Sequence, residues 1–170
     1  MVKESEKRME NKEKEERFAA LLDEYGGMIR KICYMYASDG DHFKDLCQEV
    51  VLNLWRGFDG YRGTGKLSSW IYRVGINTCI SFYRRYGRNA GHVSLEELCG
   101  VAEEESGRAL RLEEMYRLIS RLDGFERALI LLWLDEHTYE QIAEITGLPR
   151  NTVATRLRRI REKLSERAER

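Results

Sequence analysis

Apolar residues recur every three or four positions along most of this 170-residue chain, the spacing that places them on one face of a helix. In the first half of the chain this pattern predicts a bundle of three or four helices. The first helix begins at Phe18, the second ends near Gly57, and the third, capped by Ser68 or Ser69, runs to about Tyr86. No stretch of useful length alternates as a β-strand does, so we expect an all-α fold.

The second half follows the same helical spacing and contains two capping signals. Asp123 and Glu126 form a capping box before a very apolar helix, and Thr138 and Gln141 form a second box. Gly147 ends the short helix that follows Thr138, at a position suited to a left-handed backbone. A last helix comes almost at once, and its buried face consists of Val153, Leu157, Ile160 and Leu164.

The opposite face of that last helix is polar and basic. Two short helices joined by a tight turn that contains glycine are the layout of a helix-turn-helix, whose second helix enters the major groove of DNA. The side chains predicted to face the duplex are Arg150, Asn151, Thr152, Thr155, Arg158 and Arg159. The alternative is an ordinary helical hairpin with a solvated basic face.

Composition divides the chain into four segments. Residues 1–17 are nearly all charged or polar and predict a frayed or solvated helical extension at the N-terminus, and residues 18–88 form the first helical domain. Residues 89–107 are rich in glycine and glutamate, which predicts a flexible acidic linker. Residues 108–170 then form a second, four-helix domain that includes the helix-turn-helix.

Charge supports this division. The chain has 29 basic and 29 acidic residues, but residues 56–88 carry seven bases against one acid, and residues 150–163 carry six bases against one acid. The linker holds the acidic cluster Glu96, Glu97, Glu103, Glu104 and Glu105. Two basic surfaces joined by an acidic connector favour two contact points on one polyanion.

Aromatic residues alternate with bases between Trp55 and Tyr86. Exposed rings stack on unpaired bases, a contact worth roughly 1–3 kcal/mol per base, while guanidinium groups hold the phosphates. The pattern therefore predicts a surface for single-stranded DNA. Large rings are usually mostly buried, so for any one of them, such as Trp55, Trp70 or Phe82, the alternative is a place in the core.

The sequence does not support catalytic chemistry. The segment Gly60–Lys66 reads GYRGTGK, but a phosphate-binding loop would need Ser or Thr where Leu67 stands and a β-strand before the loop. Asp45 and Glu49 lie four positions apart on one exposed helix face, where protein contact explains them better than catalysis. We therefore expect no enzyme.

Metal, redox and membrane functions are also disfavoured. The four cysteines and three histidines lack ligand or disulfide spacing, so we expect small buried thiols, no metal and no cofactor. No apolar stretch is long enough for a membrane span or a signal peptide. The expected location is the cytoplasm, in association with the nucleoid and without membrane insertion.

Three motifs, in this order, resemble the extracytoplasmic-function group of bacterial sigma factors in the sigma-70 family. Residues 45–50, DLCQEV, are similar to the family's D-L-x-Q-E-V. Residues 70–77, WIYRVGIN, with Arg84 and Arg85 after them, are similar to its W-hydrophobic-x-x-hydrophobic-A-x-N run and basic pair. Residues 152–157, TVATRL, are similar to T-V-K-S-R-L. The resemblance covers nearly all of the chain after the N-terminal extension.

The resemblance implies a non-enzymatic subunit that gives core RNA polymerase its promoters. It implies that a helix face docks on the clamp coiled coil of the largest polymerase subunit through Asp45, Gln48, Glu49 and Asn53. It implies that the promoter −10 element is bound, and its strands parted, by Arg62, Lys66, Trp70, Arg73, Asn77, Arg84 and Arg85. The helix-turn-helix would read the −35 element as duplex, and an anti-sigma factor is a further implied partner.

Four positions depart from the family pattern, and two other functions stay open. An acid is usual in the family where His42 stands, and Ala is usual where Gly75 stands. Asp or Asn is usual at the position of Ser81, and Lys at that of Ala154. These departures bear on promoter preference and contact strength.

The first alternative function is a stand-alone helix-turn-helix regulator, which would dimerise and hold duplex operator without polymerase. The second is a helical interaction module whose basic surfaces meet acidic proteins.

Overall fold

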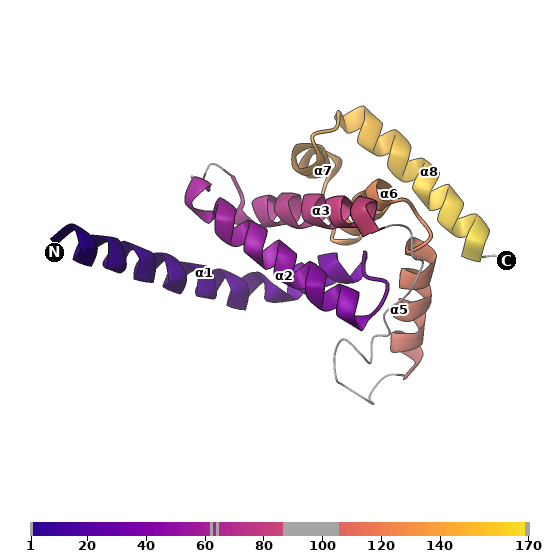
Figure 1. Cartoon of the computed structure of the whole chain (residues 1–170). Coiled ribbons are helices and arrows are strands. Elements are labelled where there is room, and N and C mark those ends of the chain that lie inside the picture. The colour runs from indigo at the N-terminus through magenta and orange to yellow at the C-terminus, as the bar shows by residue number, and fades with distance from the viewer. Residues whose placement is uncertain (1, 62, 64, 87–105, 169–170) are drawn as a thin grey trace.

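The computed structural model describes residues 2–61, 63, 65–86 and 106–168. These residues form seven α-helices and one 3₁₀ turn, so the expected all-α fold is confirmed. Figure 1 shows the long first helix, the two helices packed along it, and the helices of residues 124–134, 139–146 and 150–168 on the other side of the third helix, with the helix of residues 106–119 beyond its C-terminal end. The elements are α1 (Val2–Tyr34), α2 (Gly40–Gly57), η1 (Phe58–Gly60), α3 (Leu67–Tyr86), α5 (Ser106–Ile119), α6 (Gly124–Leu134), α7 (Tyr139–Thr146) and α8 (Arg150–Ala168). The predicted linker lies almost entirely outside the described residues.

The first part of the chain is a three-helix bundle of α1, α2 and α3. Helix α2 is capped by Asp39, whose carboxylate accepts from the backbone N–H of His42 at 2.8 Å. Its apolar stripe of Leu46, Val50 and Leu54 is buried against the other two helices. Amphipathic spacing alone predicts this stripe, because the same side chains recur on one face.

The predicted cap of α3 at Ser68 or Ser69 is wrong. The helix begins at Leu67, and the backbone N–H of Trp70 already donates to the carbonyl of Lys66 at 3.2 Å. Both serines therefore lie inside the first turn.

Gly75 explains one departure from the family pattern. A Cβ atom at this position would lie 3.2 Å from Cδ1 of Ile32 and 3.8 Å from Cγ1 of Val50. Glycine therefore lets α3 approach α1 and α2 more closely than a residue with a side chain would, since core packing leaves little room for an added methyl group.

The second part consists of α5 to α8. Both predicted capping boxes are present, at Asp123 with Glu126 and at Thr138 with Gln141. Gly147 ends α7 with φ of 75°, and its N–H donates to the carbonyl of Ala143. Beyond this turn α8 buries Val153, Leu157 and Ile160. The helix-turn-helix geometry predicted from the sequence is therefore confirmed.

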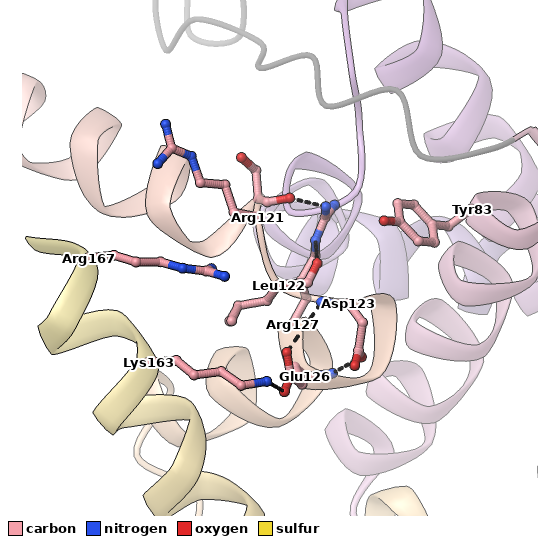
Figure 2. Close-up of a pocket in the computed structure, with 9 residues that line it drawn as sticks. Tyr83, Arg121, Leu122, Asp123, Glu126, Arg127, Lys163 and Arg167 are labelled. Atoms are coloured by element: carbon pink, nitrogen blue, oxygen red, sulfur yellow. Dashed lines mark hydrogen bonds and ion pairs between the residues drawn. The ribbon is translucent and has the colours of Figure 1, made fainter.

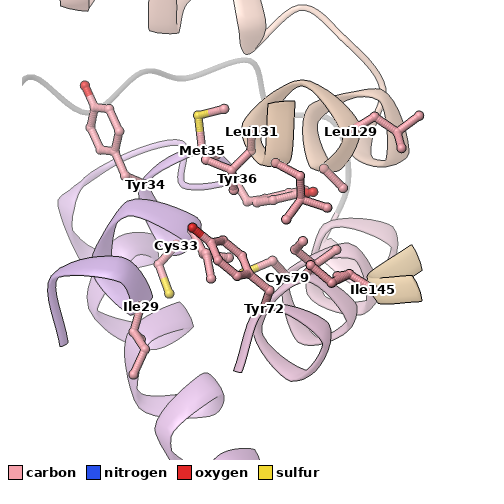
Figure 3. Close-up of a cluster of buried hydrophobic side chains, with 14 of the residues drawn as sticks. Ile29, Cys33, Tyr34, Met35, Tyr36, Tyr72, Cys79, Leu129, Leu131 and Ile145 are labelled. Atoms are coloured by element: carbon pink, nitrogen blue, oxygen red, sulfur yellow. The ribbon is translucent and has the colours of Figure 1, made fainter. Parts of the chain in front are cut away.

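The two parts pack against each other around one continuous hydrophobic core. Helix α3 contacts α6 and α7 as well as α1 and α2. Figure 3 shows buried side chains of α1 and α3, among them Cys33 and Cys79, close to Leu129 and Leu131 of α6 and Ile145 of α7. Residues of both halves therefore exclude water from the same interior.

The expectation of small buried thiols holds for Cys33 and Cys79, while Cys47 is half-buried. The hydrogen bond with Cys33, followed by burial, raises the pKa of the Cys47 thiol. Among the described residues no group of three His, Cys, Asp or Glu side chains could hold a metal ion. The fourth cysteine, Cys99, lies outside them.

We predict that Gly147→Ala lowers the free energy of unfolding by about 1–2 kcal/mol, because an L side chain disfavours the left-handed backbone. An added Cβ would meet nothing within 4 Å, so this loss comes from φ alone. Gly147→Asn should lose less, because Asn tolerates this conformation. Urea unfolding followed by circular dichroism measures both variants.

The matched control is Gly26→Ala inside α1, where an added Cβ also meets nothing and φ is not positive. It should stabilise the chain by about 0.5–1 kcal/mol, because alanine favours the helix interior. An unfolding midpoint for Gly147→Ala equal to that of the unmodified chain would contradict the argument.

Candidate nucleic-acid interface

The polar face of α2 carries the residues expected to meet polymerase. Asp45 and Gln48 are exposed, whereas Glu49 and Asn53 are half-buried. The amide nitrogen of Asn53 donates to Oγ1 of Thr78 on α3 at 3.1 Å. Asn53 therefore also joins α2 to α3, a role that its position on a polar stripe did not indicate.

The hollow between α2 and α3 brings together residues from two predicted sites. It has a volume of about 290 Å³. Its lining includes Glu49 and Asn53 from α2, and Asn77, Ser81 and Arg85 from α3. The predicted polymerase face and part of the predicted −10 set thus share one groove, because α2 and α3 pack along each other.

A second hollow, of about 220 Å³, lies at the start of α3 and is named here the −10 hollow, after the predicted −10 residues Lys66, Trp70 and Arg73 in its lining. It is lined by Gly60, Tyr61, Gly65, Lys66, Ser69, Trp70, Arg73 and Glu144. The rings of Tyr61 and Trp70 lie 5.2 Å apart between centroids, with an angle of 35° between their planes. The Tyr61 hydroxyl donates to the carbonyl of Gly65 at 2.6 Å, which fixes the ring against the loop.

Gly57 makes room for Trp70 in this hollow. A Cβ atom at Gly57 would lie 3.2 Å from Cζ2 of the indole, closer than most real contacts of a Cβ atom. The Trp70 ring is half-buried, with the end of α2 behind it. The indole therefore packs against the end of α2 as well as against Tyr61.

The predicted −10 residues of α3 lie along one exposed side of the helix. Trp70, Arg73, Asn77 and Arg84 follow each other at spacings of three, four and seven, which places them on one face. Arg73, Asn77, Arg84 and Arg85 are exposed, as is Lys66 just before the helix. Arg62, the remaining member of the set, lies outside the described residues.

Most of the aromatic residues predicted as a stacking surface contact other parts of the protein instead. Trp55 packs edge-on to Phe18 with 5.1 Å between ring centroids, and Lys14 lies over its face at 4.1 Å. Tyr72 is buried, and Tyr83 faces the guanidinium of Arg127 at 4.9 Å. The core alternative is therefore right for Tyr72, and the aromatic pair that lines the −10 hollow is Tyr61 with Trp70.

The exposed face of α8 matches the predicted duplex-reading set. Arg150, Asn151, Thr155, Arg158 and Arg159 are exposed, and Thr152 is half-buried. Two of these arginines have carboxylate partners. Nε of Arg150 pairs with the carboxylate of Glu140 at 2.5 Å. Nη1 of Arg158 lies 3.8 Å from the carboxylate of Glu162. Such exposed pairs are weak, so phosphates can replace the carboxylates at little cost.

Three other bases of α8 contact residues of α6. Arg156 lies over the ring of Phe125 at 5.4 Å, and Arg161 lies over the ring of Trp133 at 5.3 Å. Lys163 pairs with Glu126, as Figure 2 shows. The helix therefore divides its cations into a set that holds it on α6 and a set that faces outward.

Sequence reasoning missed Glu144 in the −10 hollow. This residue belongs to α7, in the second part of the chain, and its carbonyl accepts from Nη2 of Arg73 at 2.7 Å. No local pattern could indicate this contact, because the two residues are 71 positions apart.

Two family models match the chain, and both describe parts of the same family. "Sigma-70 region 2" matches residues 21–89, and "Sigma-70, region 4" matches residues 112–164. Together they cover more than two thirds of the chain, in the order expected from the motifs. A stand-alone helix-turn-helix regulator or a general interaction module would not account for the match to region 2.

Full-length relatives agree with these matches. The chain is 27% identical over 161 residues to the ECF RNA polymerase sigma factor SigW of Bacillus subtilis, covering 86% of each chain. It is also 27% identical over 168 residues to the ECF RNA polymerase sigma-E factor of Escherichia coli K12, covering 89% of this chain and 86% of that one.

Two solved structures share the fold. CnrH in complex with the cytosolic domain of CnrY matches with a TM-score of 0.66 and 20% identity, covering 91% of this chain and 89% of that one. The sigma factor RpoE of Bartonella quintana, in complex with the anti-sigma factor NepR, matches with a TM-score of 0.68 and 24% identity. The match covers 88% of this chain and 95% of that one. Both family regions, their order and their fold thus agree, and the chain belongs to the sigma-70 family as an RNA polymerase sigma factor of the extracytoplasmic-function type.

Proposed function

We propose that the polar face of α2, formed by Asp45, Gln48, Glu49 and Asn53, is the surface that binds core RNA polymerase. Two of its residues are exposed and two are half-buried, and its two carboxylates are four positions apart on one side of the helix. The observation that carries the proposal is the position of this face within the region 2 match, beside the −10 residues and away from α8. Polymerase and DNA can then contact adjacent surfaces of one rigid bundle.

The −10 hollow takes an unpaired base of the promoter. Tyr61 and Trp70 supply a ring surface for stacking, and Lys66 and Arg73 supply cations for the flanking phosphates. Asn77, Arg84 and Arg85 continue this surface along α3, and Arg62 belongs to the same set. Strand separation follows from binding energy, because a flipped base is stabilised only in the melted state.

Helix α8 reads the −35 element in the duplex major groove. Asn151 and Thr155 offer hydrogen bonds to base edges, whereas Arg158 and Arg159 suit phosphate or guanine contacts. Arg150 and Thr152 lie in the first turn of the helix, the end that contacts bases in helix-turn-helix proteins. The domain division at residues 18–88 and 108–170 belongs to the same proposal.

An anti-sigma factor is the further partner that we propose. The RpoE structure with a similar fold is a complex with an anti-sigma factor, by its own description. None of the described helices is both long enough and apolar enough to cross a bilayer. We place the site of action in the cytoplasm at the nucleoid because a subunit of RNA polymerase works on chromosomal DNA.

Charge reversal on α2 should remove polymerase binding. The double variant Asp45→Arg with Glu49→Arg places two cations on a surface that presents two carboxylates, and unfavourable charge pairing across an interface costs several kcal/mol. We expect affinity for core polymerase to fall about 100-fold or more in a fluorescence anisotropy titration.

The matched control is Glu16→Arg with Asp23→Arg, an equal change of charge at exposed positions of α1. It should bind core polymerase as the unmodified chain does. If the α2 variant keeps full affinity while its circular dichroism is unchanged, the docking face lies elsewhere.

Neutralising two outward cations of α8 should weaken the salt dependence of promoter binding. For holoenzyme with Arg158→Ala and Arg159→Ala, we expect the slope of log Kobs against log salt to fall in magnitude by about 2, because each lost phosphate contact removes about one released counterion. The DNA is a promoter fragment, identified by run-off transcription with core polymerase on a genomic library.

The control also removes two arginines from α8, but ones that contact α6. Arg156→Ala with Arg161→Ala deletes the cations that lie over Phe125 and Trp133, so it should change thermal stability more than the salt slope. Equal salt slopes for the two double variants would argue against the assignment of the outward face.

A further inference from the structure

The N-terminal half of α1 contacts the end of α2. Figure 1 shows α1 passing that end and continuing toward the N-terminus. Lys14, Arg17 and Phe18 are three and four positions apart, so they share one face of the helix. These three residues are named here the α1 brace. The region 2 model matches only from residue 21 onward, so the brace lies outside that match.

Lys14 has two partners at the end of α2. Its Nζ atom lies 2.6 Å from Oδ2 of Asp59 in η1 and 4.1 Å from the centroid of the Trp55 ring in α2. The Lys14 side chain is only 21% exposed, whereas that of Asp59 is 71% exposed. Exposed ion pairs contribute little to folding stability. The ammonium group thus joins α1 to both α2 and η1 through a contact whose loss leaves the fold intact.

The other two brace residues contact aromatic rings on either side of Gly57. Phe18 is buried and packs edge-on to Trp55 at 5.1 Å and to Phe58 at 5.3 Å between ring centroids. The guanidinium of Arg17 lies over the Phe58 ring at 5.5 Å. The brace therefore contacts both the last turn of α2 and the first residue of η1.

The same turn carries the ring pair of the −10 hollow. Tyr61 follows η1, and its backbone N–H donates to the carbonyl of Phe58 at 3.2 Å. The Tyr61 ring lies 5.2 Å from that of Trp70, and a Cβ atom at Gly57 would lie 3.2 Å from the Trp70 indole. The position of residues 57–61 therefore sets the position of both rings.

The backbone of this turn depends on contacts from outside it. Gly57 precedes η1, and Gly60 is its last residue. Glycine loses more conformational freedom on folding than any other residue, so packing from a neighbouring element is needed to favour one conformation. The α1 brace supplies such packing to Trp55, Phe58 and Asp59.

We propose that the α1 brace positions the turn of residues 57–61 and, through it, the Tyr61 and Trp70 rings proposed to take an unpaired promoter base. Lys14 is a positioning residue here, because it contacts α2 and η1 and is not part of the described lining of the hollow. The inference rests on the proposed function of the −10 hollow and adds a determinant that lies outside the region 2 match.

The test uses four variants of the full-length chain. Lys14→Met removes the charge but keeps a long unbranched side chain, and Lys14→Arg keeps the cation. Asp59→Asn breaks the same ion pair from the side of η1. The matched control is Lys12→Met, which removes an equal charge at an exposed position of the same helix. Circular dichroism melting shows that each variant is folded.

Hydrogen exchange of the free chain, followed by mass spectrometry, reports on the turn directly. For Lys14→Met and Asp59→Asn we expect the amides of residues 58–61 to exchange about threefold faster or more, because local opening of the turn becomes easier. Lys14→Arg and Lys12→Met should exchange as the unmodified chain does.

DNA binding by holoenzyme reports on the rings. The probe is a fluorescein-labelled oligonucleotide with the non-template −10 strand of the promoter fragment. Lys14→Met should lower affinity for it by about threefold or more, because stacking depends on the position of the rings. Lys14→Arg should restore the affinity, and affinity for the duplex −35 element should be unchanged. The slope of log Kobs against log salt should also be unchanged, whereas loss of a direct phosphate contact would reduce its magnitude by about 0.7.

The inference is overturned if folded Lys14→Met keeps the exchange rates of the unmodified chain at residues 58–61, or if Lys12→Met has the same effects as Lys14→Met. It is also overturned if the salt slope falls together with the affinity, since Lys14 would then contact DNA itself. Failure of the proposed function is seen separately, as failure of the unmodified holoenzyme to bind the −10 probe. Hydrogen exchange tests the brace in either case.

Discussion

The division of the surface of α3 between core and solvent is the constraint on which the rest of the structure depends. Ile71, Ile76 and Cys79 are buried, and Gly75 permits the close approach to α1 and α2. The helix also contacts α6 and α7, so one exposed strip is left for Trp70, Arg73, Asn77 and Arg84. Because the buried face fixes the rotation of the helix, it also fixes the direction in which the side chains proposed to face DNA point.

The role of an arginine in this chain is set by its surroundings and not by its charge. Arg127 is buried, and desolvation lowers its pKa, yet carbonyl oxygens and aromatic faces surround it. Arg158 and Arg159 have the same chemistry but are exposed, so their field reaches outward. A net charge of zero is thus compatible with DNA binding, because opposite charges lie on different surfaces.

Contact between the two parts and the proposed contact with DNA use some of the same groups. A guanidinium that donates to a carbonyl of α7 does not donate at the same time, in the same geometry, to a phosphate. The contact of Arg73 with the carbonyl of Glu144 and its proposed contact with a phosphate are therefore alternatives.

The sequence by itself determined the local features. Helix spacing, the boxes at Asp123 and Thr138, and the glycine at 147 all depend on residues within four positions of each other, which a linear pattern records directly. The cap of α3 was predicted wrongly, because two serines near a helix start look alike in sequence, whereas hydrogen bonding actually begins at the Lys66 carbonyl.

Only the tertiary structure decided which side chains meet across the chain. Asp135 and Lys31 are 104 positions apart, and Arg73 and Glu144 are 71 apart. The same holds for the aromatic residues, since Tyr72 is buried against Asp135 and His137, which follow α6, while Trp70, two positions away, lines a hollow. Periodicity indicates which face of a helix is buried, but not which element packs on that face. The packing partner depends on how all the apolar faces of the chain are buried together.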